Sequence, residues 1–241
     1  MAKIALQLAV LLTVVSACSQ CPQDVSQLLD QVTAHGFQSL QSLHDYVWIV
    51  EEHSTSRDGK GNIHEWTHRW ENVVANGKMY SRLLKPGENP TLPESETALS
   101  SDYRVASVEC QSAPCAYPYA FWLVTHLRES WNVRQVEDGE LQGKKLLVLD
   151  LQTKNLTHPG YRPLSGTAWI DPERCRVVRL QVMNVKANGH DQSQEVFEFG
   201  EVNGAWLPVR REQHGEDRGK FGEMVQEYTY LKFGVSTRMV P

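Results

Sequence analysis

Apolar and polar residues alternate over a long stretch of the second half of the chain, from Gly166 to Phe233. Val178, Leu180 and Val182 are separated by polar residues, and the same pattern returns around Phe197. A period of two is typical of a strand with one face buried and one face in water. The stretch therefore predicts consecutive antiparallel strands, arranged as a meander with one wet face.

Turn residues separate these apolar runs. Asp171-Pro172 favours a type I turn, because the aspartate side chain bonds to the backbone and proline presets φ. Asn203-Gly204 is a two-residue hairpin signal, and Asn76-Gly77 and Asp138-Gly139 repeat that kind of signal earlier in the chain. Pro208 indicates an edge or irregular position in the strand that follows the hairpin.

Helical spacing of apolar residues is restricted to two segments, residues 25–43 and 117–131. Gly36 is expected to interrupt the first of them. The remaining pattern predicts about eight or more strands, and a sheet of that size must curl. The predicted fold class is therefore α+β and mainly β, with a strongly curved antiparallel sheet whose apolar face is covered by helices.

The composition and the N-terminal sequence limit which functions are compatible with the chain. The chain has 241 residues, 41% of them hydrophobic, which fits one domain. A net charge of -5 argues against nucleic acid as a partner. Lys3 followed by the apolar residues 4–15 predicts an export signal over residues 1–17 and a single mature domain over residues 18–241.

Two cleavage mechanisms are compatible with the end of this signal. Ordinary signal peptidase would release a soluble periplasmic chain. Alternatively, Val15-Ser16-Ala17-Cys18 forms a lipobox, and Cys18 becomes lipidated and anchors the chain to a membrane. Ser19 favours the outer membrane in that case.

The five cysteines bear on the same question, because an odd number leaves one unpaired in an exported chain. Lipidation of Cys18 would remove the odd one. Cys110 and Cys115 are predicted to form a disulfide that closes a short loop in an oxidising compartment. Cys21 and Cys175 are either a second disulfide or two free thiols, and the sequence leaves both open.

One motif could carry catalysis. His64, Glu65 and His68 match H-E-x-x-H, which on a helix places two imidazoles on one Zn²⁺ ion as in zinc hydrolases. However, Trp66 and Trp70 alternate with polar residues in the same segment, as expected for a strand. On a strand the two histidines lie roughly 13 Å apart and cannot share a metal. We therefore favour the strand and predict no metal, no cofactor and no catalytic residue.

Four motifs resemble the periplasmic and outer-membrane lipoprotein-sorting (LolA/LolB-like) superfamily, and in particular its acidobacterial members. They are G-x-x-W-I-D at 166–171, R-V-V-R-L at 176–180, E-V-N-G-A-W-L-P at 201–208 and Y-x-x-F-x-V-x-T at 230–237. The resemblance is clearest over residues 146–237. It implies an unclosed half-barrel with helices across its open side and an apolar cavity that receives lipoprotein acyl chains.

The leading hypothesis is therefore a non-enzymatic envelope protein that binds lipid or lipoprotein acyl chains in an apolar cavity, in outer-membrane lipoprotein sorting. The residues expected to line this cavity are Val178, Leu180, Phe197, Phe199, Leu207, Val209, Phe121 and Val124. These residues are equally compatible with an ordinary core. The alternative functions are an envelope sensor or scaffold that binds protein partners and, less favoured, a zinc hydrolase acting through His64 and His68.

Overall fold

The structure is a computed structural model that describes residues 21–22, 24–42, 46–75, 78–91, 99, 101–105, 119–154, 161–186, 192–217 and 220–232. The predicted export signal, the predicted lipidation at Cys18 and the predicted Cys110–Cys115 disulfide lie outside these residues. Among the residues described, no helix is long and apolar enough to span a bilayer.

The elements follow one another from α1 to β11 along the chain. The helices are α1 (Val25–Ser42), α2 (Tyr119–Thr125) and α3 (Leu127–Ser130). The strands are β1 (Tyr46–Arg57), β2 (Ile63–Ala75), β3 (Lys78–Leu84), β4 (Arg104–Val105), β5 (Trp131–Leu141), β6 (Lys144–Thr153), β7 (Tyr161–Asp171), β8 (Arg176–Lys186), β9 (Gln192–Val202), β10 (Ala205–Asp217) and β11 (Lys220–Lys232).

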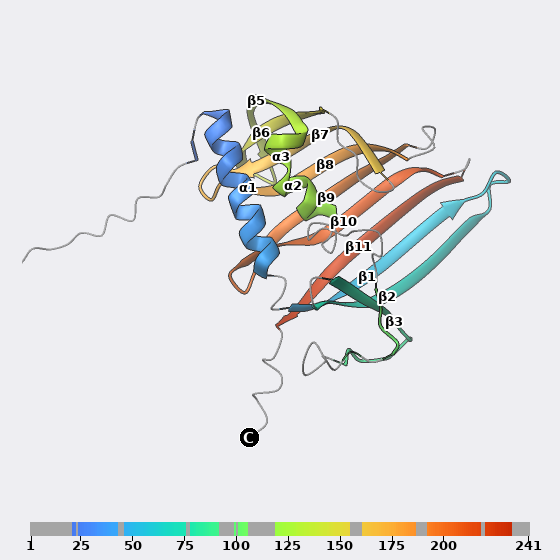
Figure 1. Cartoon of the computed structure of the whole chain (residues 1–241). Helices are drawn as coiled ribbons and strands as arrows, with labels where there is room; N and C mark the ends of the chain where they lie inside the picture. The colour runs from blue at the N-terminus through green and yellow to red at the C-terminus, as the bar shows by residue number, and fades with distance from the viewer. Residues whose placement is uncertain are drawn as a thin grey trace, which may run out of the picture.

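All strands belong to one 11-stranded antiparallel sheet with the order β4-β3-β2-β1-β11-β10-β9-β8-β7-β6-β5. Strands β5 to β11 form a meander, which confirms the arrangement predicted for residues 166–233. A second meander, β1 to β4, joins the first because Tyr46 of β1 pairs with Lys232 of β11 (Figure 1). The edges β4 and β5 are not paired with each other, so the barrel is open.

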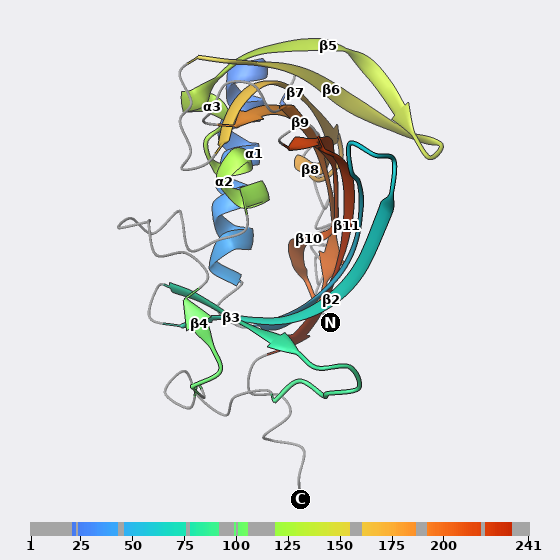
Figure 2. The same ribbon diagram turned by 90° about the vertical axis from the view of Figure 1, so that its right-hand side faces the viewer.

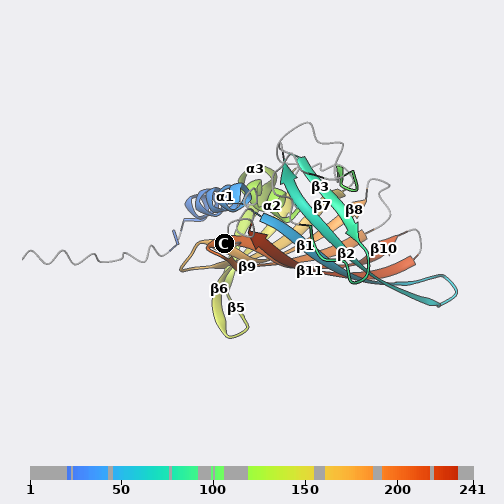
Figure 3. The same ribbon diagram turned by 90° about the horizontal axis from the view of Figure 1, so that it is seen from below.

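The sheet curves strongly, and all three helices lie on its concave side (Figure 2). The predicted fold class, a mainly β unclosed half-barrel covered by helices, is confirmed. The helices cover the part of the concave face formed by one end of β5 to β10, and β11, β1 and β2 extend beyond them (Figure 1). The β5–β6 hairpin projects on the opposite, convex side (Figure 3).

Helix α1 begins after Asp24, whose Oδ1 accepts a hydrogen bond from the backbone N–H of Gln27 at 2.9 Å, as an N-cap does. The helix continues through Gly36, so the expected interruption is wrong. A Cβ atom at Gly36 would lie 2.9 Å from Cγ1 of Val124. The glycine therefore permits close approach of α1 and α2 rather than a break in α1.

The second predicted helix is shorter than its apolar pattern. It is divided at His126 into α2 and α3, and Trp131 is already the first residue of β5. Trp131 is 1% exposed and belongs to the main core. A strand therefore buries this side chain as completely as the predicted helix would have done.

Two apolar clusters fill the space between the helices and the sheet. The main cluster lies under all three helices and includes Leu28, Val32, Leu123, Leu149, Ile170 and Leu180. The second lies at the end of α1, where Leu40 meets residues of β1, β10 and β11, and contains Trp48, Val50, Leu207 and Tyr230. Both clusters hold the helices against one part of the concave face.

A disulfide joins Cys21, which precedes α1, to Cys175 in the turn between β7 and β8, with 5.4 Å between their Cα atoms. The backbone N–H of Cys21 also donates to the carbonyl oxygen of Pro172 at 3.0 Å. Of the two alternatives that the sequence left open for these cysteines, the structure shows the disulfide. It fastens the N-terminal end of α1 to the meander.

Candidate ligand-binding site

The H-E-x-x-H segment is part of strand β2, as the alternating pattern predicted. His68 pairs with Glu52 and His64 with Ser56 on β1, so the two imidazoles project from one strand face four residues apart. The nearest carboxylate to His64 is Asp58, at 3.7 Å. In the part of the chain that the structure describes, no group of three or more histidine, cysteine, aspartate or glutamate residues could hold a metal.

Five of the eight residues predicted to line a cavity lie in the core on the concave side. Leu180, Phe197, Phe199, Leu207 and Val124 are each at most 8% exposed. One space between α1 and the strands beneath it, lined by described residues that include Val32, Val124 and Phe199, has a volume of about 10 Å³, which is room for about one water molecule. These side chains are packed, and their role in ligand binding stays a prediction. The side chain of Phe121 lies outside the described part of the chain.

Val178 and Val209 lie on the convex face, so the predicted alternation is wrong at these two positions. The β7–β8 pairing shifts between Trp169 and Ile170, and the β9–β10 pairing shifts between Pro208 and Arg210. A bulge adds one residue and moves the following side chains to the other face. Both valines line a hollow of about 670 Å³ beneath the β5–β6 hairpin.

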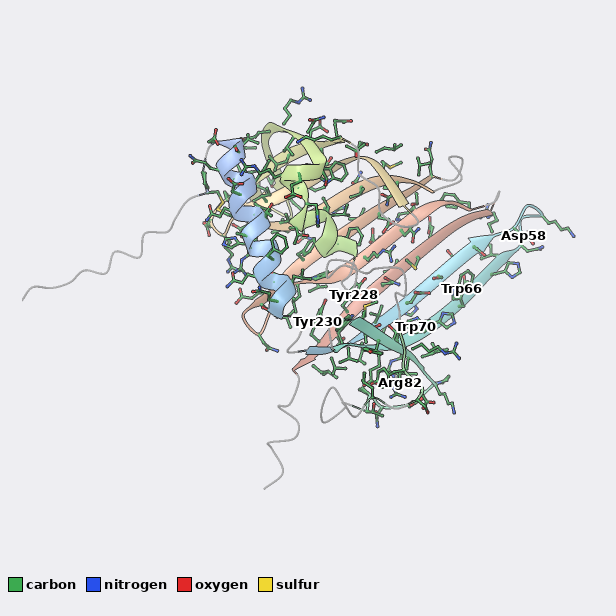
Figure 4. All side chains as sticks on the ribbon, in the orientation of Figure 1. Asp58, Trp66, Trp70, Arg82, Tyr228 and Tyr230 are labelled. Carbon is green, nitrogen blue, oxygen red and sulfur yellow. A yellow bond between two sulfur atoms is a disulfide. The ribbon has the colours of Figure 1, made fainter. Side chains whose placement is uncertain are left out.

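Apolar side chains continue along the concave face beyond the helices. Trp66 and Trp70 project from β2, Leu83 lies opposite Trp70 on β3, and Tyr228 projects from β11 (Figure 4). Trp66 is 40% exposed and Leu83 is 50% exposed. Trp70 and Tyr228 pack against the second core cluster. We call these four residues the inner patch, since they extend the apolar core into the open part of the concave face.

A buried ion pair lies beside this apolar surface. Two N–H groups of Arg211, Nε and Nη2, donate to Oε2 of Glu195 at 2.9 and 2.7 Å. Asn184 donates from Nδ2 to the other carboxylate oxygen at 2.9 Å, and Glu195 is 0% exposed. The guanidinium also lies over the ring of Phe197, 5.7 Å from its centroid. Burial of the carboxylate is thus offset by both charge and hydrogen bonds.

The hydrogen bonds continue from this ion pair across the sheet. Nη1 of Arg211 donates to Oε1 of Gln226 at 3.3 Å, and Tyr228 donates its hydroxyl to the same oxygen at 3.0 Å. Gln226 in turn donates from Nε2 to Glu52 at 2.8 Å. The residues of this inner polar network, which crosses five adjacent strands from β8 to β1, are Asn184, Glu195, Arg211, Gln226 and Glu52. No pattern in the sequence indicated this network, although the alternation of residues 64–71 did mark the tryptophan-bearing face of β2.

The network changes the acidity of the neighbouring tyrosines. Removal from water raises the pKa of Tyr228 to about 12; Arg211 opposes this shift, and the carboxylates of Glu195 and Glu52 add to it. Burial also raises the pKa of Tyr230, whose hydroxyl donates to the carbonyl oxygen of Pro208 at 2.6 Å. Both phenols therefore stay neutral at pH values at which an exposed tyrosine is ionised.

We expect the Tyr228→Phe variant to lose less stability than the wild type between pH 10 and pH 12. The unfolded phenol ionises near 10.0 and the folded one only near 12. A neutral Tyr228 therefore contributes stability that is complete below pH 10 and is lost as the pH rises towards 12, at about 1.4 kcal/mol per pH unit. Urea unfolding of both proteins across this range measures the difference. Equal losses of stability in the two proteins between pH 10 and pH 12 would contradict the raised pKa of Tyr228.

No protein-family model and no curated protein sequence matches the chain. Solved structures that match the chain include a LolA superfamily protein from Nitrosomonas europaea, with a TM-score of 0.43 and 11% identity, covering 90% of this chain and 94% of that one. A DUF1329 family protein from Desulfovibrio piger has a TM-score of 0.44 and 10% identity, covering 86% and 93%. An outer membrane lipoprotein-sorting protein domain from Vibrio parahaemolyticus has a TM-score of 0.41 and 10% identity, covering 84% and 93%.

These structures include members of the superfamily that the sequence motifs resemble, at low sequence identity. Likenesses of this size do not indicate what the chain binds. The particular closeness to acidobacterial members stays a prediction.

Proposed function

We propose that this chain is an exported, non-enzymatic envelope protein that binds lipid or lipoprotein acyl chains on the concave face of its half-barrel. The observation that carries the proposal is the inner patch, where Trp66 and Leu83 remain 40% and 50% exposed inside a curved sheet. The predicted export signal and the resemblance to lipoprotein-sorting proteins support the same function. Anchoring through Cys18 and a role in outer-membrane lipoprotein sorting are part of the proposal.

Burial of apolar surface would supply the binding free energy, at about 25 cal/mol per Å². A concave surface buries more of a ligand than a flat one, and most small-molecule sites are concave and mainly apolar. The described core residues under the helices, such as Leu180 and Phe197, are buried, so an acyl chain would first lie along the inner patch. Reaching Leu180 or Phe197 would require the helices to move away from the sheet.

We expect the Trp66→Ala variant to bind a fluorescent fatty acid about tenfold more weakly than the wild type. The substitution removes a large half-exposed ring from the inner patch, and a loss of about 1.4 kcal/mol corresponds to a factor of ten. Titration of the purified protein with the probe, followed by displacement with an unlabelled fatty acid, gives both dissociation constants.

Ile63→Ala is the matched control for this variant. Ile63 belongs to the same strand and is 59% exposed, but it alternates onto the convex face, opposite Arg57 of β1. Its truncation should leave probe binding unchanged. An equal loss of affinity in both variants, or no probe uptake by the wild type, would contradict binding on the concave face.

A further inference from the structure

Glu52 lies in the middle of the open concave face. Its direct neighbours across the strands are His68 on β2 and Gln226 on β11. Two positions further along these strands are Trp70 and Tyr228, both opposite Val50. Such diagonal neighbours are within reach of aromatic side chains. Trp70 and Tyr228 therefore lie at positions diagonal to this carboxylate on the surface assigned to the ligand, and Trp66, opposite Ser54, lies at the diagonal position on its other side.

No permanent cation neutralises this carboxylate within the described residues. The side chain of Glu52 is 16% exposed and accepts hydrogen bonds from uncharged donors, Nε2 of Gln226 at 2.8 Å and Oγ of Ser54 at 3.4 Å. Nδ1 of His68 is 3.6 Å from its Oε1 atom. Arg211, the nearest guanidinium of the network, already donates two N–H groups to Glu195.

The charged side chains near Glu52 on the concave face differ from those on the convex face. The charged side chains of the inner polar network are two carboxylates, Glu52 and Glu195, and one guanidinium, Arg211. Arg69 and Arg210 lie on the convex face, where Arg69 pairs with Glu51 at 3.1 Å and Arg210 with Glu212 at 2.6 Å. An anionic head group beside Glu52 would meet this carboxylate, and the guanidinium of the network, that of Arg211, already donates to Glu195.

We infer that the ligand of the concave face carries an organic ammonium head, which Glu52 binds among the aromatic rings of Trp66, Trp70 and Tyr228. This inference rests on the proposed function, because it assigns the head group of the same amphiphile. Aromatic rings attract an ammonium ion through their quadrupole, most strongly when the ion is partly desolvated. A partly buried carboxylate adds a charge contact that salt screens less than one at the surface. The apolar tail lies along the inner patch.

Three amphiphiles with the same ten-carbon tail test this inference: decyltrimethylammonium, decyl maltoside and decyl sulfate. Each is titrated into the purified protein at low salt and below its micelle-forming concentration, and heat release gives the dissociation constant. We expect the ammonium compound to bind about five- to tenfold more tightly than the maltoside, and the sulfate to bind most weakly. Choline without a tail should bind far more weakly than decyltrimethylammonium.

Glu52→Gln should remove the preference for the ammonium head over the maltoside, because the amide keeps the shape of the side chain without its charge. Glu51→Gln is the matched control, since Glu51 is the next residue of β1 and lies on the convex face with Arg69. It should keep the preference. If Glu52→Gln does not fold, rising salt must reduce the preference of the wild type instead.

The outcomes distinguish the ammonium site at Glu52 from acyl-chain binding by the concave face. Equal binding of all three amphiphiles overturns the ammonium site and leaves acyl-chain binding standing. Loss of the preference in Glu51→Gln overturns the assignment to Glu52. Choline binding as tightly as decyltrimethylammonium shows a small ammonium ligand and overturns the amphiphile. Binding of none of these compounds overturns the proposed function together with the inference.

Discussion

The double variant Cys21→Ser/Cys175→Ser is expected to unfold with a free energy about 5 kcal/mol lower than that of the wild type. The disulfide joins residues 154 positions apart, so its loss frees a very long loop in the unfolded chain. In the chain-entropy description, the stabilisation grows with the logarithm of loop length and reaches about 5 kcal/mol for a loop of this size. Guanidinium unfolding of the two proteins measures the loss.

Reduction of the wild type supplies the control for this variant. The reduced wild type and the double variant should unfold at the same denaturant concentration, because both lack the same cross-link. The single substitution Cys21→Ser should behave like the double one. A loss below about 1 kcal/mol in the double variant would show that the cross-link contributes little to stability.

Arg211→Met is expected to lower the free energy of unfolding by about 3–5 kcal/mol. Glu195 is 0% exposed, and the substitution leaves its carboxylate buried without a cation. Replacing both partners, as Glu195→Gln/Arg211→Met, should restore most of the loss, since no unpaired charge then remains. Urea unfolding of the single and double variants measures this coupling.

Arg210→Met is the matched control, because Arg210 is the preceding residue of β10 and pairs with Glu212 on the convex face. Both members of that pair are partly exposed, so its loss should lower stability by less than about 1 kcal/mol. Equal losses for Arg210→Met and Arg211→Met would contradict the importance of burial for the inner ion pair.

Local chemistry explains why two turns of the meander, at Asp171 and at Asn203-Gly204, could be predicted from the sequence. The turn predicted at Asp138-Gly139 is wrong, because both residues lie inside β5 and the chain turns at Gln142-Gly143 instead. Oδ1 of Asp171 accepts hydrogen bonds from the backbone N–H groups of Glu173 and Arg174 at 2.8 and 3.2 Å. Asn203 and Gly204 both adopt positive φ, at 50° and 85°, as their hairpin signal requires. Each of these features is determined by residues within a few positions of one another.

The face of the sheet on which a side chain lies was harder to predict than the position of the strand in the sequence. One extra residue in a strand reverses the side-chain pattern that follows it. Pro208 did indicate an irregularity in β10, and the register shift occurs directly after it. Nothing in the alternation around Val178 marked the shift between β7 and β8. Two of the predicted cavity residues were therefore assigned to the wrong face.

The candidate site could not be predicted as a unit, because its members meet only through the sheet register. Glu52 belongs to β1 and Gln226 to β11, and the two are brought together by pairing between the first and last strands. Arg211 and Glu195 are adjacent for the same reason, through β9 and β10. A single sequence gives the residue types of each strand but not which strand lies beside it.

The place of β11 in the sheet also determines when the fold can form. Strand β11 follows all the other described strands in the chain, and it is the one that joins the two meanders, between β1 and β10. Until it emerges, β1 lacks its partner on that side. Pairings between residues so distant in sequence form slowly. A chain truncated before Lys220 would therefore lose the centre of its sheet rather than an edge, and would expose two unpaired strand edges to other chains.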